Sequence, residues 1–117
     1  MCGIFIAISS TCNFEDDFKK IKHRGPDYTE YKTIQINNNN KIFLGFHRLS
    51  IIDLSANTIL QFENNYLVCN GEIYNYKYLI EKYNLQNIKT GSDCEVIIHL
   101  YKEYPHLWPD ILNELDG

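Results

Sequence analysis

The sequence lacks the features that mark a membrane protein or a nucleic-acid-binding protein. None of its apolar runs approaches the roughly 20 residues that a membrane-spanning helix needs. Its formal net charge of −4 disfavours nucleic acid and anionic membrane surfaces as partners. The N-terminus has no basic segment of the kind that begins a secretory signal peptide. We therefore expect a cytoplasmic protein with neither a nucleic-acid partner nor a membrane partner.

The sequence also lacks cysteine pairs at metal-binding spacing. Its four cysteines include no C-x-x-C pair, so we expect no metal site; they are Cys2, Cys12, Cys69 and Cys94. Disulfides are rare in cytosolic proteins, and we expect none here. Cys69 and Cys94 adjoin apolar patterns, which predicts small buried side chains rather than reactive thiols. With 44% hydrophobic and 22% charged residues, the composition of the 117-residue chain is that of one small globular domain.

Cys2 is the residue with a chemical reason to be reactive. If Met1 is removed, Cys2 becomes the first residue and carries a thiol and a titratable α-amine on the same carbon. An α-amine titrates near about 7.7–8.0 and a thiol near about 8.5, so the amine can accept the thiol proton at neutral pH. This is the arrangement of a nucleophile activated by an N-terminal amine. From its position alone, the better interpretation of Cys2 is an arbitrary second residue.

The spacing of apolar residues predicts an α+β domain. Residues 3–8 form an apolar run that predicts a buried strand, and Asn37 to Asn40 predict a hairpin turn with left-handed-tolerant residues. Ser92 and Glu95 have the spacing of a capping box, which predicts a helix start. In full, strands are expected at 3–8, 28–36, 41–46 and 66–69, and helices at 14–21, at 75–83, from 92 until Pro105, and at 108–115.

Four short segments accompany the Cys2-Gly3-Ile4 start. They are HRGPD at 23–27, HRLSIID at 47–53, NGEIYN at 70–75 and GSDCEV at 91–96. In this order, the five segments resemble the signature set of the class II glutamine amidotransferase domain, the N-terminal-nucleophile glutaminase half of glutamine-hydrolysing asparagine synthetase. The Pro26 in HRGPD and the Glu-Ile-Tyr in NGEIYN are similar to the asparagine synthetase branch of that class. The resemblance covers residues 1–117.

The resemblance implies the fold and the domain organisation. The family's fold is the αββα sandwich of the N-terminal-nucleophile hydrolases, within the α+β class. The family's domain continues beyond the equivalent of residues 115–117, so we expect a C-terminally incomplete sandwich. Residues 1–117 then form one truncated amidotransferase domain, and the synthetase domain with its pyrophosphate-binding loop is absent. Residues 55–61 also depart from the family, which usually has a Gln-Pro pair after HRLSI-x-D.

The resemblance also implies a reaction. Cys2 attacks the side-chain amide of L-glutamine, ammonia leaves, and water hydrolyses the γ-glutamyl thioester, with the α-amine as base and then acid. The side-chain amide of Asn70 and the N–H of Gly71 stabilise the oxyanion. Without the rest of the motif, Asn-Gly predicts only a hairpin turn. Because the base is an amine, the four histidines need no catalytic role and are expected to be structural or exposed.

The remaining implied site residues bind the substrate. Arg48 clamps the α-carboxylate of glutamine with its planar fork. Taken alone, Arg48 is more often a solvated surface charge, and Asp93 is better interpreted as part of a helix cap. The implied glutamine site consists of Arg48, Leu49, Ser50, Ile51, Ile52, Asn70, Gly71, Glu72 and Asp93, and Arg24 and Asp27 support the loop near the nucleophile. No cofactor is expected in this chain, because ATP and Mg²⁺ belong to the absent synthetase domain.

Two functions remain open from the sequence. The first is a glutaminase domain of asparagine synthetase type that supplies ammonia to a separate synthetase domain or subunit for asparagine biosynthesis. The intact motif residues favour it. The second is a truncated, non-catalytic remnant that binds glutamine weakly or only associates with a partner. The strands expected to be missing favour that alternative, because a truncated sheet exposes apolar surface.

Overall fold

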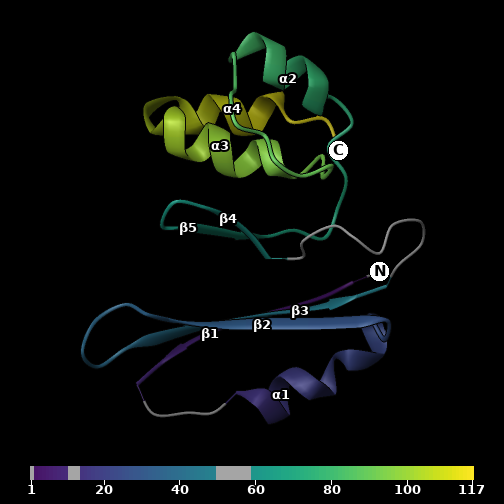
Figure 1. Cartoon of the computed structure of the whole chain (residues 1–117), viewed down its shortest axis with the longest axis vertical. Coiled ribbons are helices and arrows are strands. Elements are labelled where there is room, and N and C mark those ends of the chain that lie inside the picture. The colour runs from purple at the N-terminus through teal and green to yellow at the C-terminus, as the bar shows by residue number, and fades with distance from the viewer. Residues whose placement is uncertain (1, 11–13, 50–58) are drawn as a thin grey trace. The chain divides into compact units, whose positions relative to one another are not determined.

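The computed structural model describes residues 2–10, 14–49 and 59–117 (Figure 1). Helices and strands are mixed along the chain, which confirms the α+β class. The chain divides into two compact units. The first unit comprises Met1–Ile59 and Val68–Asn70, and the second comprises Leu60–Leu67 and Gly71–Gly117. Each unit is described by itself.

The first unit contains a three-stranded antiparallel sheet in the order β1-β3-β2. Its strands are β1 (Gly3–Ser9), β2 (Tyr28–Gln35) and β3 (Lys41–Arg48), and helix α1 (Glu15–Lys20) lies along one face (Figure 1). Phe18 of α1 is 3% exposed and packs edge-on against Phe43 of β3. A Cβ at Gly45 would lie 2.6 Å from the Phe18 ring, so the close approach of helix and sheet requires glycine there.

The expected strand at 3–8 is confirmed as β1, but the expectation that it is buried is wrong. Ile6 and Ile8 are 56% and 64% exposed. The cause is the position of β1 at the edge of the sheet. Successive side chains of a strand point to opposite faces, and α1 contacts only the face that carries Phe5. The side chains on the other face of β1 are therefore not covered by α1.

The hairpin β2–β3 matches the expected strands, and the expected turn at residues 37–40 is confirmed. The Asn37 side chain accepts hydrogen bonds from the backbone N–H groups of Asn39 and Asn40, both at 2.9 Å. None of the asparagines at 37–40 has a positive φ. The turn thus does not use the left-handed conformation that asparagine tolerates, because side-chain hydrogen bonds of the Asx type close it.

The second unit contains most of a short hairpin and the helices that follow it in the chain, whereas the 3₁₀ helix η1 (Lys22–Arg24) belongs to the first unit. The hairpin strands are β4 (Ile59–Phe62) and β5 (Asn65–Val68), and the helices are α2 (Tyr76–Lys82), α3 (Glu95–Glu103), the 3₁₀ helix η2 (Pro105–Leu107) and α4 (Trp108–Glu114). Helix α3 contacts both α2 and α4. Four side chains in the core of this unit have no exposed surface, and they come from all three α-helices: Leu79, Val96, Leu100 and Ile111.

Most of the expected elements of this unit are confirmed, with two differences. Strand β4 was not expected, because its sequence Ile-Leu-Gln-Phe is neither a continuous apolar run nor a strict alternation of apolar and polar residues. The prediction of a capping box is wrong. Cys94 occupies the N-cap without a side-chain cap hydrogen bond, and the Glu95 carboxylate accepts hydrogen bonds from Lys89 and Thr90 rather than from Ser92. The chain makes a turn between Ser92 and the helix, which moves the helix start to Glu95.

Among the helices of the described residues, none has the length and apolar character needed to cross a membrane.

Candidate active site

Cys2 and Asn70 are joined by two reciprocal hydrogen bonds in the first unit. The backbone N–H of Cys2 donates to Oδ1 of Asn70, and Nδ2 of Asn70 donates to the carbonyl oxygen of Cys2, both at 3.3 Å. The two residues are 68 positions apart in the chain. A reversed Asn70 amide would place two donors face to face, so this hydrogen-bond pair determines its orientation. The expected nucleophile and the expected oxyanion donor therefore lie side by side.

The end of strand β3 provides a second neighbour of the nucleophile. Gly3 pairs with His47 in the sheet, which places Cys2 beside the residues that follow His47. Sγ of Cys2 lies 4.0 Å from the carbonyl oxygen of Leu49. The register of two antiparallel strands thus brings the thiol to the HRLSI segment. Leu49 is 37% exposed and Arg48 is half-buried.

The HRGPD loop at 23–27 contacts the backbone next to the nucleophile and at the end of β3. Nε of Arg24 donates to the carbonyl oxygen of Cys2 at 3.4 Å, and the backbone N–H of Asp27 donates to the carbonyl oxygen of Arg48 at 3.1 Å. Gly25 passes so close to β3 that a Cβ would lie 2.1 Å from the carbonyl oxygen of His47. Both Arg24 and Asp27 therefore have the supporting positions expected for them, one on each side of the strand end.

His47 anchors the strand that ends at Arg48. It is 1% exposed, and its ring stacks on Phe18 with centroids 3.9 Å apart. Nε2 of His47 donates to the carbonyl oxygen of Phe18 at 2.9 Å, which leaves Nδ1 to accept from the Thr29 hydroxyl at 2.8 Å. A buried imidazole with both nitrogens hydrogen-bonded is structural, as expected for the histidines of this chain.

The other expected site residues belong to the second unit. The Asp93 carboxylate is half-buried and accepts a short hydrogen bond from the backbone N–H of Ile73. This contact joins the GSDCEV segment to the NGEIYN segment. Sγ of Cys94 donates to the carbonyl oxygen of Gly71 at 3.5 Å, a second contact between the same segments. Glu72 is exposed.

The expected site residues thus fall into three groups. Cys2, Arg48, Leu49 and Asn70 lie in the first unit, and Gly71, Glu72 and Asp93 lie in the second. Ser50, Ile51 and Ile52 lie outside the described residues, as does Cys12. In the described part of the chain, no group of three or more His, Cys, Asp or Glu side chains is placed to hold a metal ion.

The sequence predicted the wrong hydrogen-bond partners for Glu95. It is 5% exposed, and its carboxylate accepts hydrogen bonds from the N–H of Lys89 and from the N–H and hydroxyl of Thr90. Burial by itself raises the pKa of a carboxyl group. The Thr90 hydroxyl, the two backbone N–H groups and nearby His99 outweigh burial and hold the pKa of Glu95 below its ordinary value. The sequence pattern did mark Glu95, but as the partner of Ser92 in a capping box.

Comparison with known proteins supports the same class. Residues 1–117 match the glutamine amidotransferase domain family. A protein of Acanthamoeba polyphaga mimivirus named "Probable asparagine synthetase (glutamine-hydrolyzing)" is 40% identical over 113 residues, which cover 86% of this chain and 20% of that protein. Asparagine synthetase (glutamine-hydrolyzing) 1 of Arabidopsis thaliana is 35% identical over 129 aligned positions, which cover the whole chain and 20% of that protein. The corresponding enzyme of Asparagus officinalis is 36% identical with the same coverage.

The mixed α+β fold and the hydrogen bonds between Cys2 and the Asn70 amide are consistent with an amidotransferase domain. The chain belongs to the glutamine amidotransferase domain family. Its relatives are glutamine-hydrolysing asparagine synthetases, and it spans about a fifth of their length.

Proposed function

We propose that this chain hydrolyses L-glutamine to glutamate and ammonia through a thioester on Cys2. The observation that carries the proposal is the reciprocal pair of hydrogen bonds between Cys2 and Asn70. This pair combines a nucleophile, its own backbone nitrogen and an amide donor within one small cluster. Those are three of the groups that acyl transfer from an amide requires.

The first step begins at the nitrogen of Cys2. Once Met1 is removed, this nitrogen becomes a free α-amine, and one of its N–H groups can remain hydrogen-bonded to Oδ1 of Asn70. Its lone pair takes the proton of the Cys2 thiol. The sulfur then forms a bond to the amide carbon of glutamine, and the carbonyl electrons move to the oxygen. Asn70 thereby orients the base as well as the nucleophile.

The oxyanion needs donors that are already in place. Nδ2 of Asn70 carries two N–H groups, and one of them is used by the carbonyl oxygen of Cys2. The second N–H is the donor that we assign to the oxyanion. The backbone N–H of Gly71, the next residue in the chain, is the second donor.

The protonated α-amine then gives its proton to the leaving nitrogen, and the carbon–nitrogen bond breaks to release ammonia. A water molecule attacks the thioester, the amine accepts one of its protons, and the carbon–sulfur bond breaks. Glutamate leaves, and the proton returns to the thiol of Cys2. The cycle needs no redox partner and consumes one water per glutamine.

We assign substrate binding to the other motif residues. The guanidinium of Arg48 binds the α-carboxylate, since its planar fork matches a carboxylate with two parallel hydrogen bonds. The backbone of residues 49–52 lines the same place. The carboxylates of Glu72 and Asp93 bind the α-ammonium group. The two ends of the amino acid are then recognised by opposite charges.

The ammonia serves asparagine biosynthesis in this proposal. The relatives' names support it, since each is a glutamine-hydrolysing asparagine synthetase. The acceptor chemistry then belongs to a separate synthetase domain or subunit that uses ATP and Mg²⁺, in the cytoplasm. No cofactor is assigned to residues 1–117.

Ammonia release from glutamine tests the proposal. The chain, purified with Met1 removed, is expected to release ammonia and glutamate in equal amounts without ATP or aspartate. Cys2→Ala is expected to abolish the release, because it removes the nucleophile. Cys69→Ala is the matched control, since it removes a half-buried thiol that has no role in the reaction. Release that survives Cys2→Ala, or is lost equally in Cys69→Ala, contradicts the proposed mechanism.

One observation favours a second candidate, a non-catalytic chain that binds glutamine weakly or only associates with a partner. Ile6 and Ile8 on edge strand β1 are exposed, and exposed apolar residues on a strand edge promote association. This candidate predicts that the chain self-associates or binds apolar dyes and shows no release above the Cys2→Ala background.

A further inference from the structure

The segment that leads to Asp93 has little packing between two buried residues, Leu85 at its start and Cys94 just after Asp93. Residues 85–92 contain neither helix nor strand, and Gly91 is exposed with no atom within 4 Å of the place a Cβ would occupy. Side-chain packing at Gly91 therefore does not determine the path of the backbone. The position of Asp93 must depend on hydrogen bonds around it.

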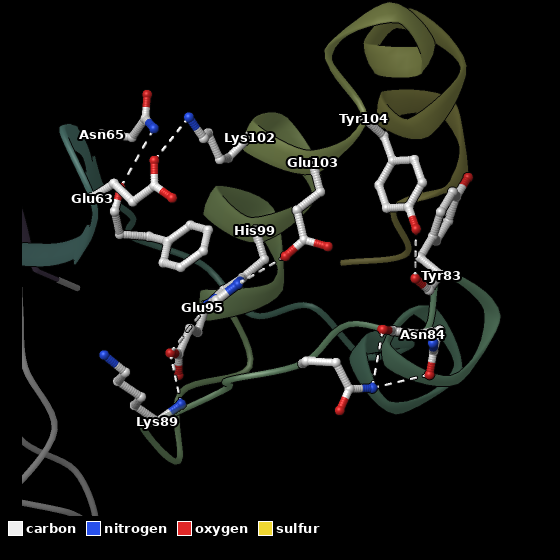
Figure 2. Close-up of polar contacts among 12 residues, drawn as sticks. Glu63, Asn65, Tyr83, Asn84, Lys89, Glu95, His99, Lys102, Glu103 and Tyr104 are labelled. Atoms are coloured by element: carbon white, nitrogen blue, oxygen red, sulfur yellow. Dashed lines mark hydrogen bonds and ion pairs between the residues drawn. The ribbon is translucent and has the colours of Figure 1, made fainter.

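Glu95 provides these hydrogen bonds from the first residue of α3 (Figure 2). Oε1 accepts from the N–H of Lys89 at 2.9 Å. Oε2 accepts from the N–H of Thr90 at 2.7 Å and from its hydroxyl at 2.5 Å. The Thr90 hydroxyl oxygen in turn accepts from the N–H of Ser92 at 3.2 Å, and the N–H of Glu95 donates to the carbonyl oxygen of Ser92 at 3.2 Å. One carboxylate thus organises the backbone on both sides of Gly91.

A buried carboxylate at this position lowers the stability of the fold unless hydrogen-bond donors compensate it. Glu95 is 5% exposed, and Nε2 of His99 lies 3.5 Å from its Oε1 (Figure 2). Burying a carboxylate costs free energy that three strong donors compensate. The segment that receives this support ends at Asp93, to which the Ile73 N–H donates.

We propose that Glu95 is a positioning residue for the α-ammonium site of glutamine: it holds residues 89–92 so that the Asp93 carboxylate meets the substrate's ammonium group. The inference rests on the proposed role of Asp93. Glu95 does not touch the substrate, and it acts by restraining the backbone that carries Asp93. Its effect is specific to ligands that have an α-ammonium group.

Equilibrium binding in a Cys2→Ala background tests the inference without catalysis. Two ligands are compared by calorimetry: L-glutamine and glutaramate, which has the same carboxylate and side-chain amide but no α-ammonium group. Glu95→Gln places an amide N–H₂ where a carboxylate oxygen faced an N–H donor, so the segment loses at least one hydrogen bond. We expect the Kd for glutamine to rise about tenfold, which corresponds to about 1.4 kcal/mol. The Kd for glutaramate is expected to change less than about twofold.

Three further variants complete the experiment. Thr90→Val keeps the Glu95 charge and the side-chain shape, so it tests the same link if Glu95→Gln fails to fold, with a smaller selective loss expected. Glu103→Gln is the matched control on the same helix: Oε1 of Glu103 lies 3.6 Å from Nδ1 of His99, and the Glu103 side chain contacts nothing in 89–92 among the described contacts. It is expected to leave both affinities unchanged. Asp93→Asn is expected to show the selective loss, and adding Glu95→Gln to it is expected to cost little more.

Equal weakening of both ligands by Glu95→Gln overturns the inference, because it indicates a purely structural role. Unchanged glutamine affinity in Glu95→Gln and Thr90→Val overturns it as well, and so does an absence of glutamine binding in the Cys2→Ala background. Failure of the proposed hydrolysis is distinguishable from these results. In that case the chain with Cys2 intact releases no ammonia, while the selective loss of glutamine affinity persists and supports the role of Glu95.

Discussion

Replacing Asn70 by alanine is the most informative change at the nucleophile. The side chain is expected to donate to the oxyanion, and removal of one such donor lowers kcat by roughly 10²–10³. At about 1.36 kcal/mol per tenfold, this loss is roughly 3–4 kcal/mol of transition-state stabilisation. The KM for glutamine is expected to change little, because the ground-state carbonyl does not yet carry the charge.

The structure predicts a much smaller effect of the same change on folding. Asn70 is exposed, and both of its hydrogen bonds to Cys2 are 3.3 Å long, at the weak end of the ordinary range. A hydrogen bond contributes about 0.5–1.5 kcal/mol to stability, and these two are expected at or below the lower value. Thermal unfolding of Asn70→Ala is therefore expected within a few degrees of the parent chain, so lost activity will not reflect lost structure.

The assay is the initial rate of glutamate formation over a range of glutamine concentrations. Asn70→Asp separates the two roles of the side chain, because it keeps an oxygen for the Cys2 nitrogen but has no N–H for the oxyanion. It is expected to lose as much kcat as Asn70→Ala. Asn113→Ala is the control, since it removes one exposed asparagine hydrogen bond on α4, at 3.2 Å. A kcat for Asn70→Ala within about threefold of the parent, while Cys2→Ala is inactive, refutes the assignment of the oxyanion donor.

Three other predictions follow from the same site. Arg48→Lys keeps the charge but loses the two-point contact with a carboxylate, so the KM for glutamine should rise steeply with kcat nearly unchanged; an unaltered KM shows that Arg48 is not the clamp. Intact-mass analysis should find Met1 removed from active protein, and hydrolysis by a chain that retains it contradicts the role of the Cys2 amine. The pKa of Glu95 is lower when folded, so its contribution to stability is present above the ordinary value of 4.5 and is lost as pH falls through the lower folded value. Denaturant unfolding from pH 7 to 3 should show this loss, with a shallower dependence in Glu95→Gln; equal slopes exclude it.

Much of the fold could be predicted because local patterns determine local elements. Alternation of β-branched and aromatic residues around the asparagine tract indicated β2 and β3, and helical spacing of Phe14 and Phe18 indicated α1. Those signals depend only on neighbours in the chain. Burial depends on the tertiary structure as well, so the apolar run of β1 was wrongly expected to be buried. Its exposure follows from its place at the edge of the sheet, and that place is a property of strand order.

The sequence by itself determined the class of the domain and which residues are proposed to carry the chemistry. Cys2, Arg48, Asn70 and Asp93 stand in motifs that can be recognised without coordinates, and the class of the domain followed from them. The tertiary structure decided which of these residues meet. The 68-residue separation of Cys2 from Asn70 is closed only when the chain folds.

The tertiary structure also decided what Glu95 does. The spacing of Ser92 and Glu95 predicts a capping box, and this prediction fails because a turn between Ser92 and the helix changes which donors the carboxylate can reach. Glu95 therefore accepts hydrogen bonds from Lys89 and Thr90. A side chain's identity is local information, whereas its partners depend on the path that the backbone takes around it in the folded unit.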